Sequence, residues 1–455
     1  MAETKTENQI MEKIVALCKR RGFIFQSSEI YGGLNGVWDY GPLGADLKRN
    51  IRDHWWRSMT QYRDDIVGMD GAILMNRAVW QATGHEANFS DDMVDCKECK
   101  SRFRADQIPP NKKGQKPGSC PECGGELMPA RKFNLLFQTY VGPVQDESAI
   151  TYLRPETAQA MFVQFKNVLE VARKKLPFGI AQVGKAFRNE INPRNFTFRS
   201  REFEQMEVEY FCKPDQGLAL TDQWLEDRLR WYEEIGIPRT KIRVNDIPDG
   251  ERAFYSKKTY DLEYEFPFGV QELEGIAYRT DYDLSRHQEK SGKALDYFDE
   301  ETKERLVPHV VEPSAGLDRT VLAVLCQAYD EEKTTDEKGN EEVRVVLRFA
   351  PKIAPIKVGV FPLLKNKPEL VAKAKEIVEK LRRHMVVFYD ESGAIGRRYR
   401  RMDEAGTPFG VTVDFETLEG KEGPKDTVTL RHRDSMKQER VAIDELLPRL
   451  LAALA

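Results

Sequence analysis

The sequence lacks a long apolar run. No stretch of about 18 consecutive apolar residues, the length that a membrane-spanning helix requires, occurs in the 455-residue chain. The N-terminal segment MAETKTENQIMEKIVALCKRRGF also lacks the apolar core of a signal peptide. The chain contains no internal repeat and no low-complexity tract, which excludes repeat architectures. We therefore expect a cytoplasmic protein with no membrane partner.

The sequence also lacks a strong excess of charge. Its 70 lysines and arginines nearly balance 74 aspartates and glutamates, which leaves a formal net charge of −4. This balance excludes a polybasic protein, but nucleic acid remains a candidate partner because phosphate binding requires only a local basic surface. A composition of 40% hydrophobic and 32% charged residues is typical of a globular protein. Because 455 residues exceed one ordinary core, we expect two or three domains.

Cysteine is scarce, and its pattern argues against a disulfide framework. Four of the seven cysteines form two CxxC pairs separated by 20 residues, and these are Cys96, Cys99, Cys120 and Cys123. Two such turns can present four thiolates to one tetrahedral zinc ion, and four protein ligands leave no open position for chemistry. We predict a structural zinc site in a small insert at residues 90–131, with four incidental thiols as the alternative. The other three cysteines lie in apolar patterns and are predicted core residues.

Two predicted strands carry an unusual number of charges. Residues 178–190 and 201–210 alternate as β-strands do, and each strand has one polar face. Arg188 lies on the polar face of the first strand, and Phe203 and Glu207 lie on that of the second. An antiparallel sheet with one face in water would give this pattern. A nucleotide site would also give it, because guanidinium groups bind phosphate and an aromatic ring can stack on a base.

A glycine-containing turn, EPSAGLDR at residues 312–319, leads into an apolar helix. Arg319 falls in the first turn of that helix, where the helix dipole favours an anion. Taken alone, an arginine at residue 319 would more often be an ordinary surface charge. Its position beside a glycine turn favours an anion-binding role.

The pattern changes beyond residue 350 to alternating strands and helices, which predicts a separate α/β domain. The charged tract at residues 330–342 is nearly devoid of apolar residues and is predicted to be an exposed loop. Within the C-terminal domain a basic helix is predicted at about residues 396–404. Its charges would either face water or contact backbone phosphates.

Together these segments resemble the class II aminoacyl-tRNA synthetases. GPLG at 41–44 resembles motif 1, FRNE at 187–190 with the downstream REF resembles motif 2, and GLDR at 316–319 resembles motif 3. A closer resemblance is to glycyl-tRNA synthetases of the α2 dimeric type, and it is seen in the segments RPETAQA, REFEQMEVEYF and ELEGIAYRTDYDL. APKIAPIKVGV and GTPFGVTVDFETL resemble the anticodon-binding domain of that family. The resemblance covers nearly the whole chain, with one departure at Ala160, where the family more often has glycine.

The resemblance implies a fold and an activity. The fold would be an α+β catalytic domain built on an antiparallel sheet over residues 1–350, a zinc-ribbon-like insert at 90–131, and a C-terminal α/β anticodon-binding domain at 351–455. The activity would be that of an ATP-dependent, AMP-forming glycine–tRNA ligase, with Mg²⁺ and structural Zn²⁺ as cofactors. The implied partners are ATP, glycine, tRNA(Gly) and a second copy of the chain in a homodimer.

The resemblance also implies residues for each ligand. For catalysis they are Arg188, Glu190 and Arg319. For ATP they are Arg188, Asn189, Glu190, Phe198, Arg199, Arg201, Phe203, Glu272, Leu273, Gly316 and Arg319. For glycine they are Arg104, Glu156, Glu207, Glu312 and Ser314. For magnesium the candidate is Glu272, and for zinc the candidates are Cys96, Cys99, Cys120 and Cys123. For tRNA they are Arg397, Arg398, Arg400, Arg401, Arg431 and Arg433.

In the implied reaction Arg188 would hold the α-phosphate, Phe203 would stack on adenine, and Arg319 would bind the γ-phosphate. Positioning and charge stabilisation would matter more than a general base. Glycine offers only its charged ends, and a tight pocket needs to exclude only larger amino acids, so no editing domain is expected.

Three other functions remain open from the sequence. The first is a class II synthetase for another small amino acid, such as a seryl, threonyl or alanyl enzyme. The second is a synthetase-like accessory protein that binds nucleic acid without catalysis, although it would not need the motif arginines. The third is a zinc-dependent nucleic-acid module, which would leave residues 187–210 unexplained.

Overall fold

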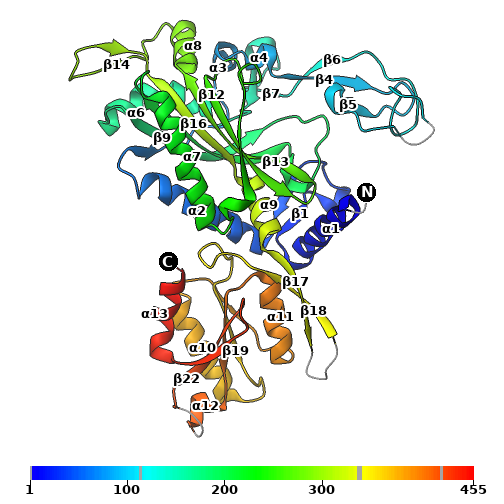
Figure 1. Ribbon diagram of the computed structural model, residues 1–455, viewed down its shortest axis with the longest axis vertical. Helices are drawn as coiled ribbons and strands as arrows, with labels where there is room; N and C mark the ends of the chain where they lie inside the picture. The colour runs from blue at the N-terminus through cyan, green and yellow to red at the C-terminus, as the bar shows by residue number, and fades with distance from the viewer. Residues whose placement is uncertain (1–2, 112–114, 336–340, 421–423, 455) are drawn as a thin grey trace.

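A seven-stranded sheet forms the centre of the N-terminal part of the chain (Figure 1). We describe residues 3–111, 115–335, 341–420 and 424–454 of a computed structural model. The strand order is β11-β12-β13-β16-β10-β9-β3, and neighbours are antiparallel except β9 and β3, which are parallel. The strands are β3 (Ile66–Gly68), β9 (Phe178–Phe187), β10 (Glu202–Cys212), β11 (Ile242–Asp246), β12 (Lys258–Phe266), β13 (Gly269–Thr280) and β16 (His309–Gly316). The predicted antiparallel α+β fold is confirmed.

Helices cover both faces of this sheet. They are α1 (Glu3–Arg21), α2 (Pro42–Thr60), α5 (Ala158–Val163), α6 (Phe165–Ala172), α7 (Gly217–Glu234), α8 (Tyr282–Ser291) and α9 (Leu317–Ala328). On β10, Met206, Val208 and Tyr210 pack into the main core together with α2, α7 and α9. Phe211 points to the opposite face and packs with α5, α6 and α8. In the part of the chain that the structure describes, no helix combines the length and apolarity needed to cross a membrane.

Helix α2 fits closely against the segment that precedes it. Pro42 occupies its first turn, where the missing N–H is not needed. Leu47, Ile51 and Trp55 recur every four residues and are buried, so one side of the helix faces the core. A Cβ atom on Gly44 would lie only 1.8 Å from the backbone oxygen of Phe23, so glycine permits this approach.

The predicted insert projects from the central sheet as a small three-stranded sheet (Figure 1). Its strands are β4 (Ser90–Asp95), β5 (Arg102–Arg104) and β6 (Arg131–Asn134), and a 3-10 turn, η2, spans Ala105–Gln107. Val94 and Phe103 form a small core with Cys96 and Cys120. Near the insert, α3 (Arg77–Ala82) and α4 (His85–Asn88) precede β4, and β7 (Phe137–Tyr140) pairs with β8 (Ile150–Leu153).

The C-terminal part has its own five-stranded sheet, ordered β20-β19-β21-β22-β23. Strand β19 is parallel to both β20 and β21. The β21–β22 and β22–β23 pairings are antiparallel. The strands are β19 (Val358–Pro362), β20 (Val387–Tyr389), β21 (Phe409–Val413), β22 (Thr427–His432) and β23 (Gln438–Ala442). The helices are α10 (Pro368–Leu381), α11 (Ile395–Ala405), α12 (Phe415–Glu419) and α13 (Ile443–Leu454). Strand–helix alternation predicted this arrangement, but it missed α12 and β23.

One local prediction was wrong. The charged tract at 330–342, predicted to be an exposed loop, is mostly a hairpin of β17 (Tyr329–Thr335) and β18 (Glu341–Leu347), although residues 336–340 lie outside the described part. The hairpin forms because Arg344 of β18, and Arg348 directly after that strand, pair with the acids of β17, which local composition does not reveal.

We predict that Gly44→Ala lowers the Tm of the protein and that Gly396→Ala does not. A methyl group at residue 44 would overlap the backbone of Phe23, and overpacking costs about 1–3 kcal/mol. In helix α11, none of the described atoms lies within 4 Å of a Cβ on Gly396, and alanine there gains up to about 1 kcal/mol of helix propensity. Scanning calorimetry measures both variants, and equal Tm changes would contradict this explanation.

Candidate active site

A cavity of about 170 Å³ opens on the polar face of the central sheet, at the N-terminus of α9. It brings together segments that are up to about 130 residues apart in sequence. The predicted residues that line it are Arg188, Glu190, Phe198, Arg199, Phe203, Glu272, Leu273, Ser314, Gly316 and Arg319. The lining residues that the sequence analysis missed are Thr197, Ser200, Glu204, Gln205 and Asp318. Strand alternation could have found Gln205, which shares its face with Phe203.

Arg188 lies beside an aromatic floor. Its Nε donates a hydrogen bond to the backbone oxygen of Pro155 at 3.1 Å, which fixes the side chain. The centre of its guanidinium lies 5.3 Å from the Phe203 ring and 5.5 Å from the Phe89 ring. Phe203 stands opposite the small Ala186 in the β9–β10 pairing. An arginine beside a flat aromatic ring suits a nucleotide, because the guanidinium group can bind a phosphate and the ring can stack on the base.

Arg319 forms the other side of the cavity. Its guanidinium lies 4.4 Å from the Phe198 ring, and its Nη1 lies 3.3 Å from the Glu272 carboxylate. Asp261, which the sequence analysis missed, lies on β12 across from Gly275, close to Glu272. Burial and the Glu272 carboxylate raise the pKa of Asp261 to about 6. Two carboxylates beside an arginine provide the oxygen ligands that Mg²⁺ prefers.

Deeper on the same face, buried acidic side chains form a cluster that we call the acidic pocket. Glu207 accepts hydrogen bonds from the Ser314 hydroxyl at 2.6 Å and the Gln205 amide at 2.7 Å, and a further one from the Thr157 hydroxyl. Burial and the Glu156 carboxylate raise the pKa of Glu207, although the two hydroxyls oppose the shift. The structure thus brings Glu156, Glu207, Glu312 and Ser314 together, as the glycine-site prediction requires.

The pKa values of the two other acids of the pocket, Glu156 and Glu312, are shifted in opposite directions. Burial opposes ionisation of Glu156, but His85, 3.3 Å away, outweighs it and holds the pKa of Glu156 well below its usual range. Burial raises the pKa of Glu312 to about 8, although Arg279 donates a hydrogen bond to it.

Arg279, which the sequence analysis missed, lies among the buried acids. Two of its nitrogens donate to Asp283 at 2.8 and 2.9 Å, and its guanidinium stacks 4.2 Å from the Tyr255 ring. A third nitrogen donates to Glu312. The i, i+4 spacing of Arg279 and Asp283 was visible in the sequence, but their partners come from distant segments. Arg279 is the main compensating cation beside the buried acids.

Three residues that were predicted to bind ATP or glycine are bonded to other groups of the protein. Arg104 pairs with Asp91 at 3.0 Å and with Asp106 at 2.9 Å, both within the insert. Arg201 donates to the backbone oxygens of Asn35 and Glu190 at 2.7 and 2.9 Å, which braces the motif 2 loop. The backbone of Asn189 donates to Leu135. Their contacts with ATP or glycine stay predictions.

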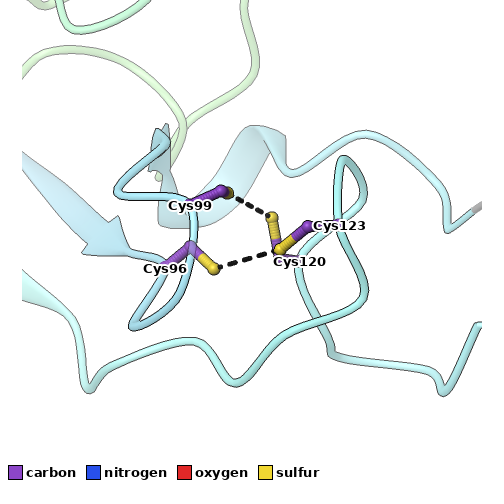
Figure 2. A group of neighbouring side chains, drawn as sticks. All are labelled: Cys96, Cys99, Cys120 and Cys123. Atoms are coloured by element: carbon purple, nitrogen blue, oxygen red, sulfur yellow. Dashed lines mark hydrogen bonds between the residues drawn. The ribbon is translucent and has the colours of Figure 1, made fainter.

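The four cluster cysteines converge in the insert (Figure 2). Their sulfurs all lie within 4.8 Å of one another, with Cys96 and Cys123 at 3.5 Å and Cys99 and Cys120 at 3.6 Å. Tetrahedral zinc with bonds of about 2.3 Å separates its sulfurs by about 3.8 Å. The donor set and its spacing therefore fit a zinc ion.

The insert also touches the loop that carries the motif 2 arginines. The Gln107 side chain accepts hydrogen bonds from Arg194 at 2.9 Å and from Arg199 at 3.2 Å. The Asn192 amide donates to the backbone oxygen of Arg102 at 3.0 Å. The cysteine cluster therefore holds a module that supports one wall of the cavity.

The six predicted tRNA-binding arginines differ in exposure. Arg431 forms a two-pronged pair with Asp403 at 2.9 and 3.1 Å, and it is only 8% exposed. Arg433 donates to the backbone oxygens of Gly406 and Phe349, and Arg398 to that of Gly393. These three guanidinium groups are buried and brace the fold, so they are not available to RNA in this arrangement.

The remaining three arginines lie on the outer side of α11. Arg397 is exposed, whereas Arg400 pairs with Glu342 and Arg401 pairs with Asp390. On the same helix, Glu404 pairs with Arg20 and Arg21 of α1. Helix α11 therefore also joins the two parts of the chain.

Asp318 joins the motif segments. Its Oδ1 accepts hydrogen bonds from the Tyr40 hydroxyl at 2.6 Å and from Lys48 at 2.9 Å, and its Oδ2 accepts one from the backbone N–H of Glu204 at 2.6 Å. Lys48 also pairs with the Glu204 carboxylate at 3.0 Å. Burial would lower the pKa of Lys48, but the two carboxylates outweigh it and raise that pKa. Motif 1 is thus bonded to the residue that precedes Arg319.

Comparison with known proteins gives matches along almost the whole chain. Residues 139–328 match the tRNA synthetase class II core domain (G, H, P, S and T), and residues 357–453 match an anticodon binding domain. A glycine–tRNA ligase of Treponema denticola is 54% identical over 97% of this chain and 96% of its own. Those of Thermobifida fusca and Clostridium perfringens are 50% and 49% identical, over 99% and 98% of both chains.

We predict that Lys48→Met destabilises the protein far more than Lys185→Met. Removing Lys48 leaves the partly buried Asp318 and Glu204 facing each other, and breaking a buried ion pair costs about 3–5 kcal/mol. Lys185 pairs with Glu202 on the same sheet, but its side chain is 50% exposed, where ion pairs contribute little. Scanning calorimetry of both variants tests this, and similar Tm losses would contradict the role assigned to Asp318.

Proposed function

The chain belongs to the glycine–tRNA ligase family of class II aminoacyl-tRNA synthetases, and from this membership we infer that it ligates glycine to tRNA(Gly) with ATP. The observation that supports this function best is the junction of a cavity lined by Arg188, Phe203 and Arg319 with a buried acidic pocket. The cavity suits ATP, and the acids suit the ammonium group of an amino acid with no side chain.

We propose that the reaction has two steps. A carboxylate oxygen of glycine attacks the α-phosphorus of ATP, pyrophosphate leaves, and glycyl-adenylate forms. A terminal ribose hydroxyl of tRNA(Gly) then attacks the carbonyl carbon of the adenylate, and AMP leaves. No protein nucleophile is required, so positioning and charge stabilisation provide the rate enhancement.

In the first step Arg188 would hold the α-phosphate and offset the negative charge that develops there. Phe203 would stack on adenine, and Arg319 would bind the γ-phosphate. Mg²⁺ bound with ATP would offset phosphate charge, and Glu272 and Asp261 are the carboxylates that would hold it. Glu190, Asn189, Arg199 and Arg201 are proposed to shape the surrounding loop.

The acidic pocket would recognise glycine by its ammonium group. Glu156, Glu207 and Glu312 would face the charge, and Ser314 would add a hydroxyl. Glu207 is held by two hydroxyls and an amide, so a larger substrate would have to displace hydrogen-bonded groups. We propose that Arg104 reaches the bound glycine from the insert only after it releases Asp91 or Asp106.

We assign the catalytic domain to residues 1–350, the zinc insert to 90–131 and the anticodon-binding domain to 351–455. For tRNA contact we retain Arg397, Arg400 and Arg401, and we give Arg398, Arg431 and Arg433 a structural role. We further propose a homodimer in the cytoplasm. Ile30 and Tyr31, each 87% exposed, and Leu34, 55% exposed, form an apolar surface beside motif 1 that a second copy would cover.

We predict glycine-dependent ATP–pyrophosphate exchange when all twenty amino acids are compared. Exchange with alanine or serine but not glycine would contradict the proposed substrate, and no exchange would favour an accessory protein. Arg188→Ala should reduce the exchange at least about a hundredfold, as removal of a transition-state donor does. Arg243→Ala, on the edge strand β11 with a side chain that is 70% exposed, is the control and should leave the rate within about twofold.

We predict about one zinc per chain and its loss in Cys99→Ser. Because the insert supports Arg194 and Arg199, loss of metal should also make residues 90–131 more sensitive to protease and weaken exchange. Cys326→Ser, in helix α9 and outside the cluster, is the matched control. Plasma emission measures the metal, and equal zinc in Cys99→Ser and the wild type would contradict the assignment.

A further inference from the structure

Glu209 is the one acid on the pocket face of β10 for which the proposed reaction has no use. Its side chain is fully buried. Within the described ranges, neither of its carboxylate oxygens has a hydrogen-bond partner. A buried ionised carboxylate without a donor is very costly, so such a group takes up a proton instead.

The strand register gives Glu209 an acidic neighbour. Because Glu207 pairs with Ser314 and Tyr210 pairs with Val311, Glu209 lies directly across from Glu312. On its other side Glu209 pairs with Ile180 of β9, which is also fully buried. Glu209 therefore has a carboxyl group on one side and a hydrocarbon side chain on the other.

Titratable groups from the adjoining elements surround these two carboxyl groups. Those that interact with Glu209 or Glu312 are Glu207 on β10, Arg279 on β13, Asp283 on α8, Glu156 before α5 and Tyr255 before β12. His85 on α4 and His287 on α8 lie one step further out, beside Glu156. Arg279 is committed to Asp283 by two hydrogen bonds and gives Glu312 only one. Asp283 also accepts a hydrogen bond from Gln159 at 3.0 Å. The acids that lack sufficient donors are thus Glu209 and Glu312.

We propose that Glu209 and Glu312 are both protonated in the glycine-free pocket, and that the ammonium group of glycine displaces one proton from Glu312. Glu209 stays a neutral acid throughout and acts as a positioning residue beneath the pocket. This inference rests on the proposed glycine site and specifies its regulation by pH. No bond other than O–H is broken, and the proton leaves to solvent.

The electrostatics give the sign of the effect. Burial and Glu312 raise the pKa of Glu209 well above its usual range, and burial raises that of Glu312 to about 8. An ammonium group beside Glu312 favours its carboxylate and lowers its pKa. Glycine therefore binds more tightly as pH rises towards 8, by up to about tenfold per pH unit, and the affinity then levels off.

Calorimetric titration of the full chain with glycine tests this coupling. The protein is first saturated with a non-hydrolysable ATP analogue, and the titration is repeated at pH 7 in buffers with different enthalpies of ionisation. The dependence of the heat on the buffer gives the number of protons released. We expect nearly one proton per glycine in the wild type, and a value near zero would overturn the proposal.

Two variants test which carboxyl group releases the proton. Glu209→Gln resembles the neutral acid, so it should keep glycine affinity within about threefold and still release one proton. A tenfold or greater loss of affinity would show that Glu209 carries a needed charge and would overturn its role. Glu312→Gln should bind glycine more weakly and release no proton, and continued release would overturn the assignment to Glu312. Absence of any glycine binding to the wild type would contradict the proposed function itself.

Discussion

The site depends on one strand, β10, whose two faces lie in opposite environments, an apolar core and an acidic pocket. On β10, Met206 and Val208 pack into the main core, while Glu207 and Glu209 face the pocket. The two sets alternate because side chains of a strand point to opposite faces, so a shift of one residue in register would bury acids in the apolar core. The pairings with β9 and β16 on both sides fix that register. Chemistry and core packing are therefore specified by the same strand.

Burial of several acids on one face has a second consequence. Each ionised carboxylate requires donors or a cation. Glu207 has two hydroxyls and an amide, and Asp283 has Arg279. Glu312 shares Arg279 with Asp283, so the pocket remains short of positive charge. In the proposed reaction the ammonium group of glycine would supply that charge, and a substrate without one would leave the acids uncompensated.

Local patterns predicted the elements better than their partners. Alternation gave the polar faces of β9 and β10, and the CxxC spacing identified a cluster whose sulfurs do converge. Arg431 was a plausible RNA contact by composition alone, but the fold places Asp403 beside it. In the same way, the charged tract at 330–342 contains a strand because Arg344 and Arg348 lie across from it. Such pairings join residues far apart in sequence, so local periodicity cannot reveal them.

The bonds of Asp318 relate the surface of the molecule to its chemistry. Tyr40 ends strand β2 (Trp38–Tyr40), which pairs with β1 (Ile24–Gln26) and follows the exposed apolar segment that contains Tyr31. Tyr40 is bonded to Asp318, and Asp318 is followed directly by Arg319 in the cavity. Only a few contacts therefore separate the proposed subunit interface from Arg319, to which we assign the γ-phosphate. A partner that orders the segment before β2 would order Tyr40, and through Asp318 it would fix the start of α9. The segment around motif 1, although motif 1 itself does not line the 170 Å³ cavity, is in this way bonded to the start of motif 3.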